Sequence, residues 1–123
     1  MEIIFDIRET RHAVMGYRGG DIAGLLENVV YLELLRRGYS VYIGKFNDAE
    51  VDFIANHADE RLYIQVTYVL TEDNIDREFA PLEAIEDNYP KIIISTDSLV
   101  KINRNGIRQV NILDFLLDGA FHS

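Results

Sequence analysis

The chain contains no cysteine, which excludes a disulfide framework and any metal site built from thiolates. It has no apolar run that approaches the roughly 20 residues of a membrane-spanning helix. Residues 1–6 also lack the basic region and the apolar run that are typical of a signal peptide. These absences favour a cytoplasmic location.

Positive charge is scarce, because 12 Lys and Arg residues stand against 21 Asp and Glu residues, for a net charge of −9. Most nucleic-acid-binding domains carry a basic patch, since neutralisation of phosphates supplies much of their affinity. The acidic excess disfavours non-specific binding to DNA and anionic lipid, and it favours cations or basic partners. A local basic strip stays open as an alternative, with Arg104 and Arg108 near the end of the chain and with Arg8, Arg11, His12 and Arg18 near its start.

The length of 123 residues and the 48% hydrophobic content predict one globular domain over residues 1–123. Its core should lie at about residues 21–96, where apolar segments follow one another closely. The irregular opening, with Gly16, Gly19 and Gly20, suggests that the chain is a fragment of a larger natural protein.

The order of elements predicts an α/β fold. A long helix should begin at Asp21 and end before Gly38, and its apolar residues spread so far around it that heavy burial is expected. Three strands, a helix and a fourth strand should follow, with an edge strand and a short helix at the end. The expected ranges are 39–45, 50–54, 62–68, 71–87, 91–96, 107–111 and 112–117. This αβββαβ order predicts a mixed central sheet flanked by helices, with the third and fourth strands parallel.

Three polar side chains lie within these apolar segments. Glu27 has no cation three or four residues away on its helix, and Asp52 and Gln65 interrupt two neighbouring strands. Polar groups in such places need a partner, a metal or solvent. If the two strands pair as a hairpin, Asp52 and Gln65 could lie near each other, although the sequence does not fix the register. The alternative for Glu27 is that it reaches solvent beside Tyr31. Glu78 is assigned to local surface ion pairs.

The order αβββαβ with Glu27, Asp52 and Gln65 at these places resembles the PD-(D/E)XK nuclease superfamily. Residues 50–55 (EVDFIA) look like its second-strand motif and residues 64–67 (IQVT) like its third. The resemblance implies a restriction-endonuclease-like core in which Glu27, Asp52 and Gln65 surround a divalent cation, Mg²⁺ or Mn²⁺.

The chain departs from this pattern at two positions. Thr67 stands where the superfamily has a lysine, and Gln65 is neutral. A cation near the attacked phosphate stabilises developing negative charge, which a threonine hydroxyl cannot do. The catalytic set of Glu27, Asp52, Gln65 and Thr67 is therefore expected to be degenerate and inactive, and a cation to bind weakly. Lys45 and Lys91 are the candidates for a charge supplied from a neighbouring strand.

A closer resemblance covers nearly the entire chain. It is carried by residues 24–28, 50–53, 63–66, 77–79, 87–91 and 106–107. Together they look like the C-terminal domain of unknown function that follows an AAA-type P-loop ATPase module in bacteria and archaea. The resemblance implies an ATPase module N-terminal to this chain as a partner in the same polypeptide. The chain has no Walker A motif, so it should not hydrolyse ATP alone.

The expected function is that of a non-catalytic accessory domain which contacts the ATPase module or another protein. Two alternatives stay open. One is a Mg²⁺-dependent nuclease that acts on DNA or RNA, with Glu27 and Asp52 holding the metal and Gln65 adding a carbonyl ligand. The other is a nucleic-acid-binding module without cleavage.

Overall fold

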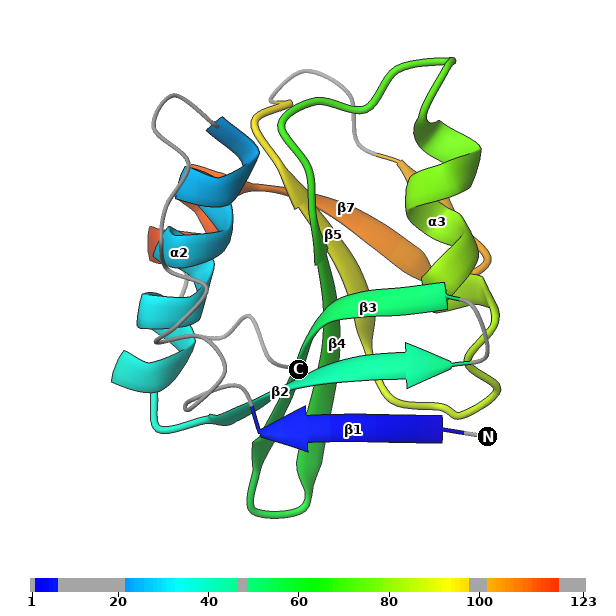
Figure 1. The fold of residues 1–123 in the computed structure, drawn as a ribbon. Helices are drawn as coiled ribbons and strands as arrows, with labels where there is room; N and C mark the ends of the chain where they lie inside the picture. The colour runs from blue at the N-terminus through cyan, green and yellow to red at the C-terminus, as the bar shows by residue number, and fades with distance from the viewer. Residues whose placement is uncertain (1, 7–21, 47–48, 98–101, 118–123) are drawn as a thin grey trace.

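The computed structural model describes residues 2–6, 22–46, 49–97 and 102–117 (Figure 1). The elements are β1 (Glu2–Asp6), α2 (Ile22–Arg36), β2 (Ser40–Phe46), β3 (Ala49–His57), β4 (Glu60–Val66), α3 (Ile75–Glu83), β5 (Lys91–Ser95), β6 (Asn103–Arg104), β7 (Ile107–Asn111) and α4 (Ile112–Leu117). The predicted α/β fold and its αβββαβ core, α2 to β5, are confirmed.

Within the described residues the strands form one seven-stranded mixed sheet in the order β1-β2-β3-β4-β5-β7-β6. Strands β1 to β4 are antiparallel neighbours. Helix α3 connects β4 to β5, which are parallel as predicted, and β5 is parallel to β7. The prediction of an edge strand at residues 107–111 is wrong, because β7 pairs with β6 on its other side through a tight hairpin.

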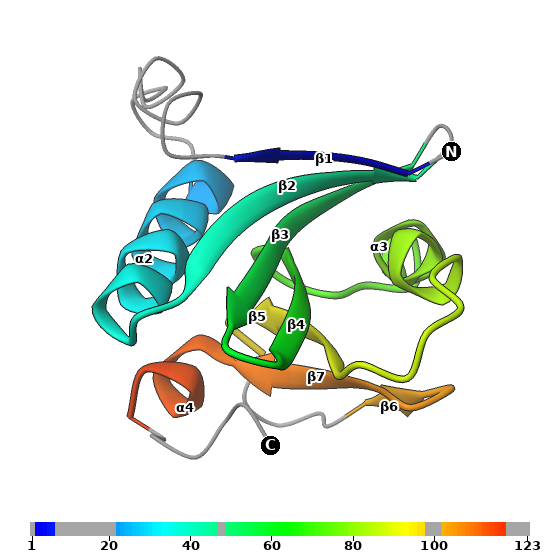
Figure 2. The same cartoon turned by 90° about the horizontal axis from the view of Figure 1, so that it is seen from below.

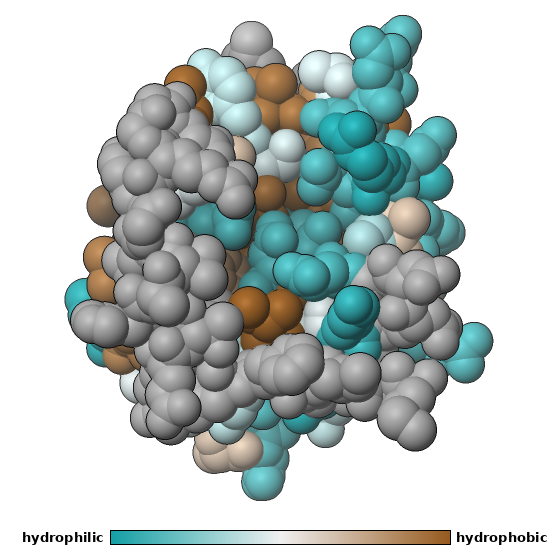
Figure 3. Space-filling view, in the orientation of Figure 1, coloured by the Kyte–Doolittle hydropathy of each residue, from teal (hydrophilic) through white to brown (hydrophobic). Residues whose placement is uncertain are grey.

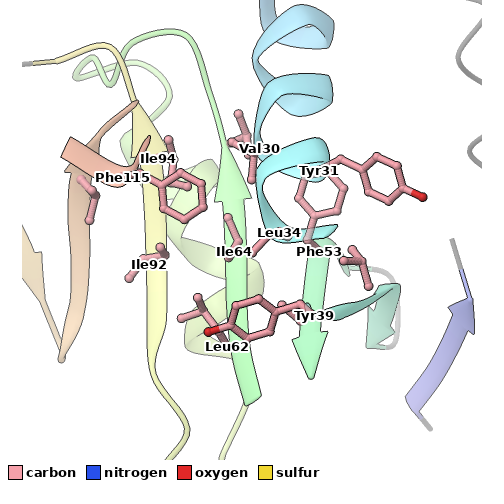
Figure 4. Packing of buried hydrophobic residues seen from close by; sticks show 14 of the residues in the cluster. Val30, Tyr31, Leu34, Tyr39, Phe53, Leu62, Ile64, Ile92, Ile94 and Phe115 are labelled. Carbon is pink, nitrogen blue, oxygen red and sulfur yellow. The ribbon is translucent and has the colours of Figure 1, made fainter. Parts of the chain in front are cut away.

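Helices cover both faces of the sheet (Figure 2). Helices α2 and α4 pack on one face, over a buried cluster that includes Leu34, Phe53, Ile64, Ile94 and Phe115 (Figure 4). Helix α3 packs on the other face, over a second cluster. The sheet therefore separates two hydrophobic cores. The point where strands β3 and β4 diverge lies between the two helical layers.

Helix α2 ends as the sequence predicts. Gly38 has φ +90°, and the backbone N–H groups of Gly38 and Tyr39 donate to the carbonyls of Leu35 and Leu34. Asp21, the expected N-cap, lies outside the described residues. The prediction of heavy burial is wrong for one side of the helix. Only Val30, Tyr31 and Leu34 of α2 are buried, whereas its outer side carries exposed apolar residues.

Helix α3 is shorter than the predicted range of 71–87. It ends at Glu83, and Asp87, at the end of the predicted range, instead makes contacts with residues of the sheet. The Tyr63 hydroxyl and the Lys91 ammonium both donate to its carboxylate, at 2.5 and 2.9 Å. These contacts attach the segment between α3 and β5 to the sheet.

Candidate functional site

Strand β3 bends at Asp52. Tyr42 of β2 lies opposite Ile54 and Gly44 lies opposite Val51, so β3 has one more residue than β2 between these two pairs. This is the arrangement of a β-bulge, which bends a strand and re-aims its side chains. As a result Val51 and Ile54, three residues apart, both belong to the core under α3. The bulge lies beside the place where β3 leaves β4.

Side-chain hydrogen bonds join β3 to β4 beyond the last backbone pair. That pair is Phe53 with Ile64. The backbone N–H of Asp52 then donates to Oε1 of Gln65 at 2.7 Å, and the N–H of Val66 donates to Oδ2 of Asp52 at 2.8 Å. The predicted proximity of Asp52 and Gln65 is thus confirmed. We call this pair of contacts the Asp52–Gln65 junction.

Glu27 lies on the inner side of α2. It precedes Tyr31 by four residues and Leu34 by seven, the spacing of one helical face, and both of those side chains are buried. Glu27 itself is partly buried, and its charge raises the pKa of Asp52. The negative charge of Glu27 therefore acts on Asp52.

The environment of Asp52 opposes its ionisation. Burial is the largest cause, the negative charge of Glu27 is the next, and Glu78 and Glu50 add to it, while the hydrogen bond from Val66 acts in the opposite direction. The net result is a pKa raised from 3.8 to about 7. At neutral pH the protonated and ionised forms of this carboxyl group therefore coexist.

Glu78 contributes to the electrostatics of Asp52, a role that sequence reasoning missed. The side chain on α3 is partly buried, and burial raises its pKa. A signal was present, because Glu78 follows Ile75 by three residues and precedes Leu82 by four, and both apolar residues belong to the core under α3. The position of Glu78 on the helix therefore indicated a side chain on the inner face of α3, not one in a surface ion pair.

Within the described residues, no hydrogen bond joins a lysine to Thr67. Thr67 is buried, its backbone N–H donates to the Ile94 carbonyl at 3.0 Å, and its hydroxyl is 3.5 Å from the Val69 carbonyl. Lys91 lies opposite Tyr63 in the parallel register and its ammonium binds Asp87. It is therefore not the replacement for the missing lysine. Lys45 lies opposite Glu50, two residues before Asp52 on β3.

The fit of these residues to a divalent cation is partial. In the described part of the chain, no group of three or more His, Cys, Asp or Glu side chains could hold a metal ion. Glu27, Asp52 and Gln65 are the residues that could contribute oxygens. Oε1 of Gln65 and Oδ2 of Asp52 already accept backbone hydrogen bonds, and Oδ1 of Asp52 accepts none within the described residues. A cation would thus compete with the junction for two of the oxygens.

Hydrophilic residues gather in the middle of the face that Figure 3 shows, between the side of α2 and that of α3. The strands diverge on this face (Figure 1).

Comparison with known proteins gives two relatives, both described only as uncharacterized proteins. One, from Haemophilus influenzae, is 45% identical over 107 residues, which are 87% of this chain and 26% of the relative. The other, from Methanocaldococcus jannaschii, is 43% identical over 68 residues, 51% of this chain and 15% of the relative. The chain thus spans about a quarter or less of the length of these relatives. It matches no family profile and no solved structure. Among the described helices, none has the length and apolar character needed to cross a membrane.

Proposed function

We propose that the chain is a non-catalytic accessory domain with a nuclease-like fold, attached in its natural polypeptide to an AAA-type ATPase module. The observation that carries the proposal is the Asp52–Gln65 junction. Two oxygens that a nuclease would direct at its metal instead accept hydrogen bonds from strand backbone, at 2.7 and 2.8 Å. In this role they satisfy backbone N–H groups that would be costly to leave unpaired.

The surroundings of Thr67 support the same conclusion. Phosphodiester cleavage needs a positive charge beside the attacked phosphate. Thr67 supplies none, and Lys91 is engaged by Asp87. Among the described residues, the site thus has carboxylates like those of a nuclease, but Thr67 and Lys91 do not supply the positive side chain that cleavage needs.

The length of the relatives supports the assignment to a longer polypeptide, since most of each relative lies outside the matched stretch. The ATPase module itself rests on the sequence resemblance described above. A cytoplasmic location agrees with the absence of cysteine.

Calorimetric titration with Mg²⁺ and Mn²⁺ tests the proposal. The unaltered chain is expected to show no binding at millimolar cation, and Glu27→Gln and Asp52→Asn should give the same result. Binding by the unaltered chain that both substitutions abolish would overturn the proposal. Glu60→Gln is the matched control, because it removes an exposed carboxylate at the start of β4, at the opposite end of the strand from Gln65.

The second candidate is a Mg²⁺-dependent nuclease, and the electrostatics of Asp52 favour it. Glu27, Glu78 and Glu50 all raise the pKa of Asp52, and a divalent cation would relieve that repulsion. Cleavage of single- or double-stranded DNA or RNA that requires Mg²⁺ and is lost in Asp52→Asn would establish this function.

Nucleic-acid binding without cleavage has less support. Arg104, one member of the suggested basic strip, forms ion pairs with Asp76 and Glu83 of α3, at 2.7 and 3.1 Å. Its charge is thereby neutralised within the domain. The basic group at residues 8–18 lies outside the described residues.

A further inference from the structure

Helix α2 exposes an apolar stripe along its outer side. Ile22, Leu25, Val29 and Leu32 follow one another at intervals of three, four and three residues, the spacing of one helical face. Their exposed fractions are 46%, 41%, 37% and 56%. We call these four residues the α2 stripe. It lies on the opposite side of the helix from Val30 and Leu34, which pack against the sheet.

The stripe has the pattern of a helix–helix contact. A three–four spacing of aliphatic residues is the seam that a helix presents to another helix. No charged residue belongs to the stripe, and Glu33, on the helix beside it, is paired with both Arg36 and Arg37. A helix with apolar residues on all of its sides is usually covered by other parts of a protein on all of its sides. Here the described residues leave one side in water.

We propose that the α2 stripe is the docking face for a part of the same polypeptide outside residues 1–123, which presents an uncharged apolar helical surface. The proposal rests on the proposed function of an accessory domain. Its first support is the length of the relatives, because 74% of the Haemophilus protein lies beyond the matched stretch. A matched stretch of 107 residues includes α2 wherever it begins in this chain.

The size of the stripe distinguishes this occupant from a second copy of the chain. About half of each of four aliphatic side chains is exposed, an apolar area on the order of 300 Å². A stable complex of separate proteins buries about 800 Å² on each partner. A contact within one polypeptide needs less, because a covalent connection gives an effective concentration of about millimolar.

Cysteine accessibility tests the proposal, and the absence of natural cysteine in the chain makes the labelling unambiguous there. Leu25→Cys and Leu32→Cys are each made in chain 1–123 and in the complete gene product. Ala80→Cys, at an exposed position on α3 across the sheet, is the matched control. Maleimide labelling rates are read from the modified peptides by mass spectrometry, and equal thermal midpoints establish that each variant folds.

In the complete gene product, labelling of Leu25→Cys and Leu32→Cys is expected to slow at least ten-fold relative to chain 1–123, with Ala80→Cys unchanged. Equal rates in the two proteins would overturn the proposal. Slow labelling already in chain 1–123 would also overturn the proposal. In that case, protection that is lost on dilution would indicate a second copy of the chain, and protection that persists would indicate a covering segment of the chain itself. None of these variants alters Asp52 or Glu27, so this test and the cation titration can fail independently.

Discussion

Gln65 accepts a hydrogen bond from the backbone N–H of Asp52 at 2.7 Å, at the place where the ladder between β3 and β4 ends. The Asp52 carboxylate makes the reciprocal contact with the N–H of Val66 at 2.8 Å. The bulge in β3 turns the strand away, and the two side chains supply acceptors that backbone carbonyls would otherwise provide. The polar residues that interrupt two apolar strands thus have a structural role in addition to any chemical one.

Replacement of Gln65 by leucine should destabilise the domain. Gln65→Leu keeps the side chain of similar size but removes the acceptor for the Asp52 N–H, which costs about 1–3 kcal/mol for a buried donor. Urea unfolding measures the change. Thr67→Val is the control, because the Thr67 hydroxyl is 3.5 Å from its nearest acceptor and its loss should cost less than about 1 kcal/mol. Equal effects of the two substitutions would mean that the junction does not hold the strands together.

Asp52→Asn should remove a pH dependence. The pKa of Asp52 is raised from 3.8 to about 7, so the folded chain holds a proton that the unfolded chain has released. The free energy of unfolding therefore falls as the pH rises from about 4 to about 7. Above about pH 7 this loss of stability stays constant. Between pH 5 and pH 8 the variant should gain about 2 kcal/mol relative to the unaltered chain. Asp59→Asn, in the exposed turn after β3, makes the same chemical change as a control, and parallel curves for all three proteins would contradict the assignment.

Much of the fold follows from local sequence signals. The breaks at Gly38 and at Asn105-Gly106 were predictable, because each requires a positive φ that these residue types accept. The place of β7 was not predictable, because the two-residue strand β6 that covers its edge is too short to leave a periodic pattern. The exposed side of α2 was also missed. Apolar residues around a helix indicate that it is covered, but they do not indicate by which chain.

The candidate site was predictable in part. Glu27, Asp52 and Gln65 were found because each is polar within an apolar segment. The structure joins Asp52 to Gln65 by a hydrogen bond, and the charge of Glu27 raises the pKa of Asp52. The bulge at Asp52 could not be predicted, since an extra residue becomes visible only when the register with β2 is known. Glu78 was missed because it was assigned to local ion pairs on the surface before its helical face was considered.

Ser95→Ala should destabilise the domain more than the same change at its neighbour. The Ser95 side chain is fully buried. Its hydroxyl donates to Asp97 at 2.7 Å and accepts from Gln109 of β7 at 2.9 Å. Loss of the Ser95 hydroxyl leaves Asp97 and Gln109 without this hydrogen-bond partner and should cost about 1–3 kcal/mol. Thr96→Ala removes one hydrogen bond on the more exposed side and should cost about 1 kcal/mol or less. Chemical denaturation of the two variants compares them, and a larger loss for Thr96→Ala would contradict the network.

Tyr63→Phe should weaken the attachment of the segment between α3 and β5. The Tyr63 hydroxyl is buried and donates to Asp87 at 2.5 Å, and burial is the main cause that raises its pKa to about 12. Burial of Asp87 acts to raise the pKa of that carboxyl, but hydrogen bonds from Tyr63 and Lys91 outweigh it and lower the pKa. Asp87 therefore contributes stability above its unfolded pKa, which is lost as the pH falls through its folded value.

Removal of the hydroxyl should cost about 1–3 kcal/mol at pH 7 and should move the titration of Asp87 to higher pH. NMR titration of the Asp87 carboxyl carbon and urea unfolding measure the two effects together. Tyr89→Phe is the matched control, because the ring of Tyr89 lies exposed beside Arg61 and would be retained. A loss of stability in Tyr63→Phe without a shift at Asp87 would assign the effect to the other contact of the hydroxyl, which accepts a hydrogen bond from Arg61 at 3.3 Å, rather than to its bond with Asp87.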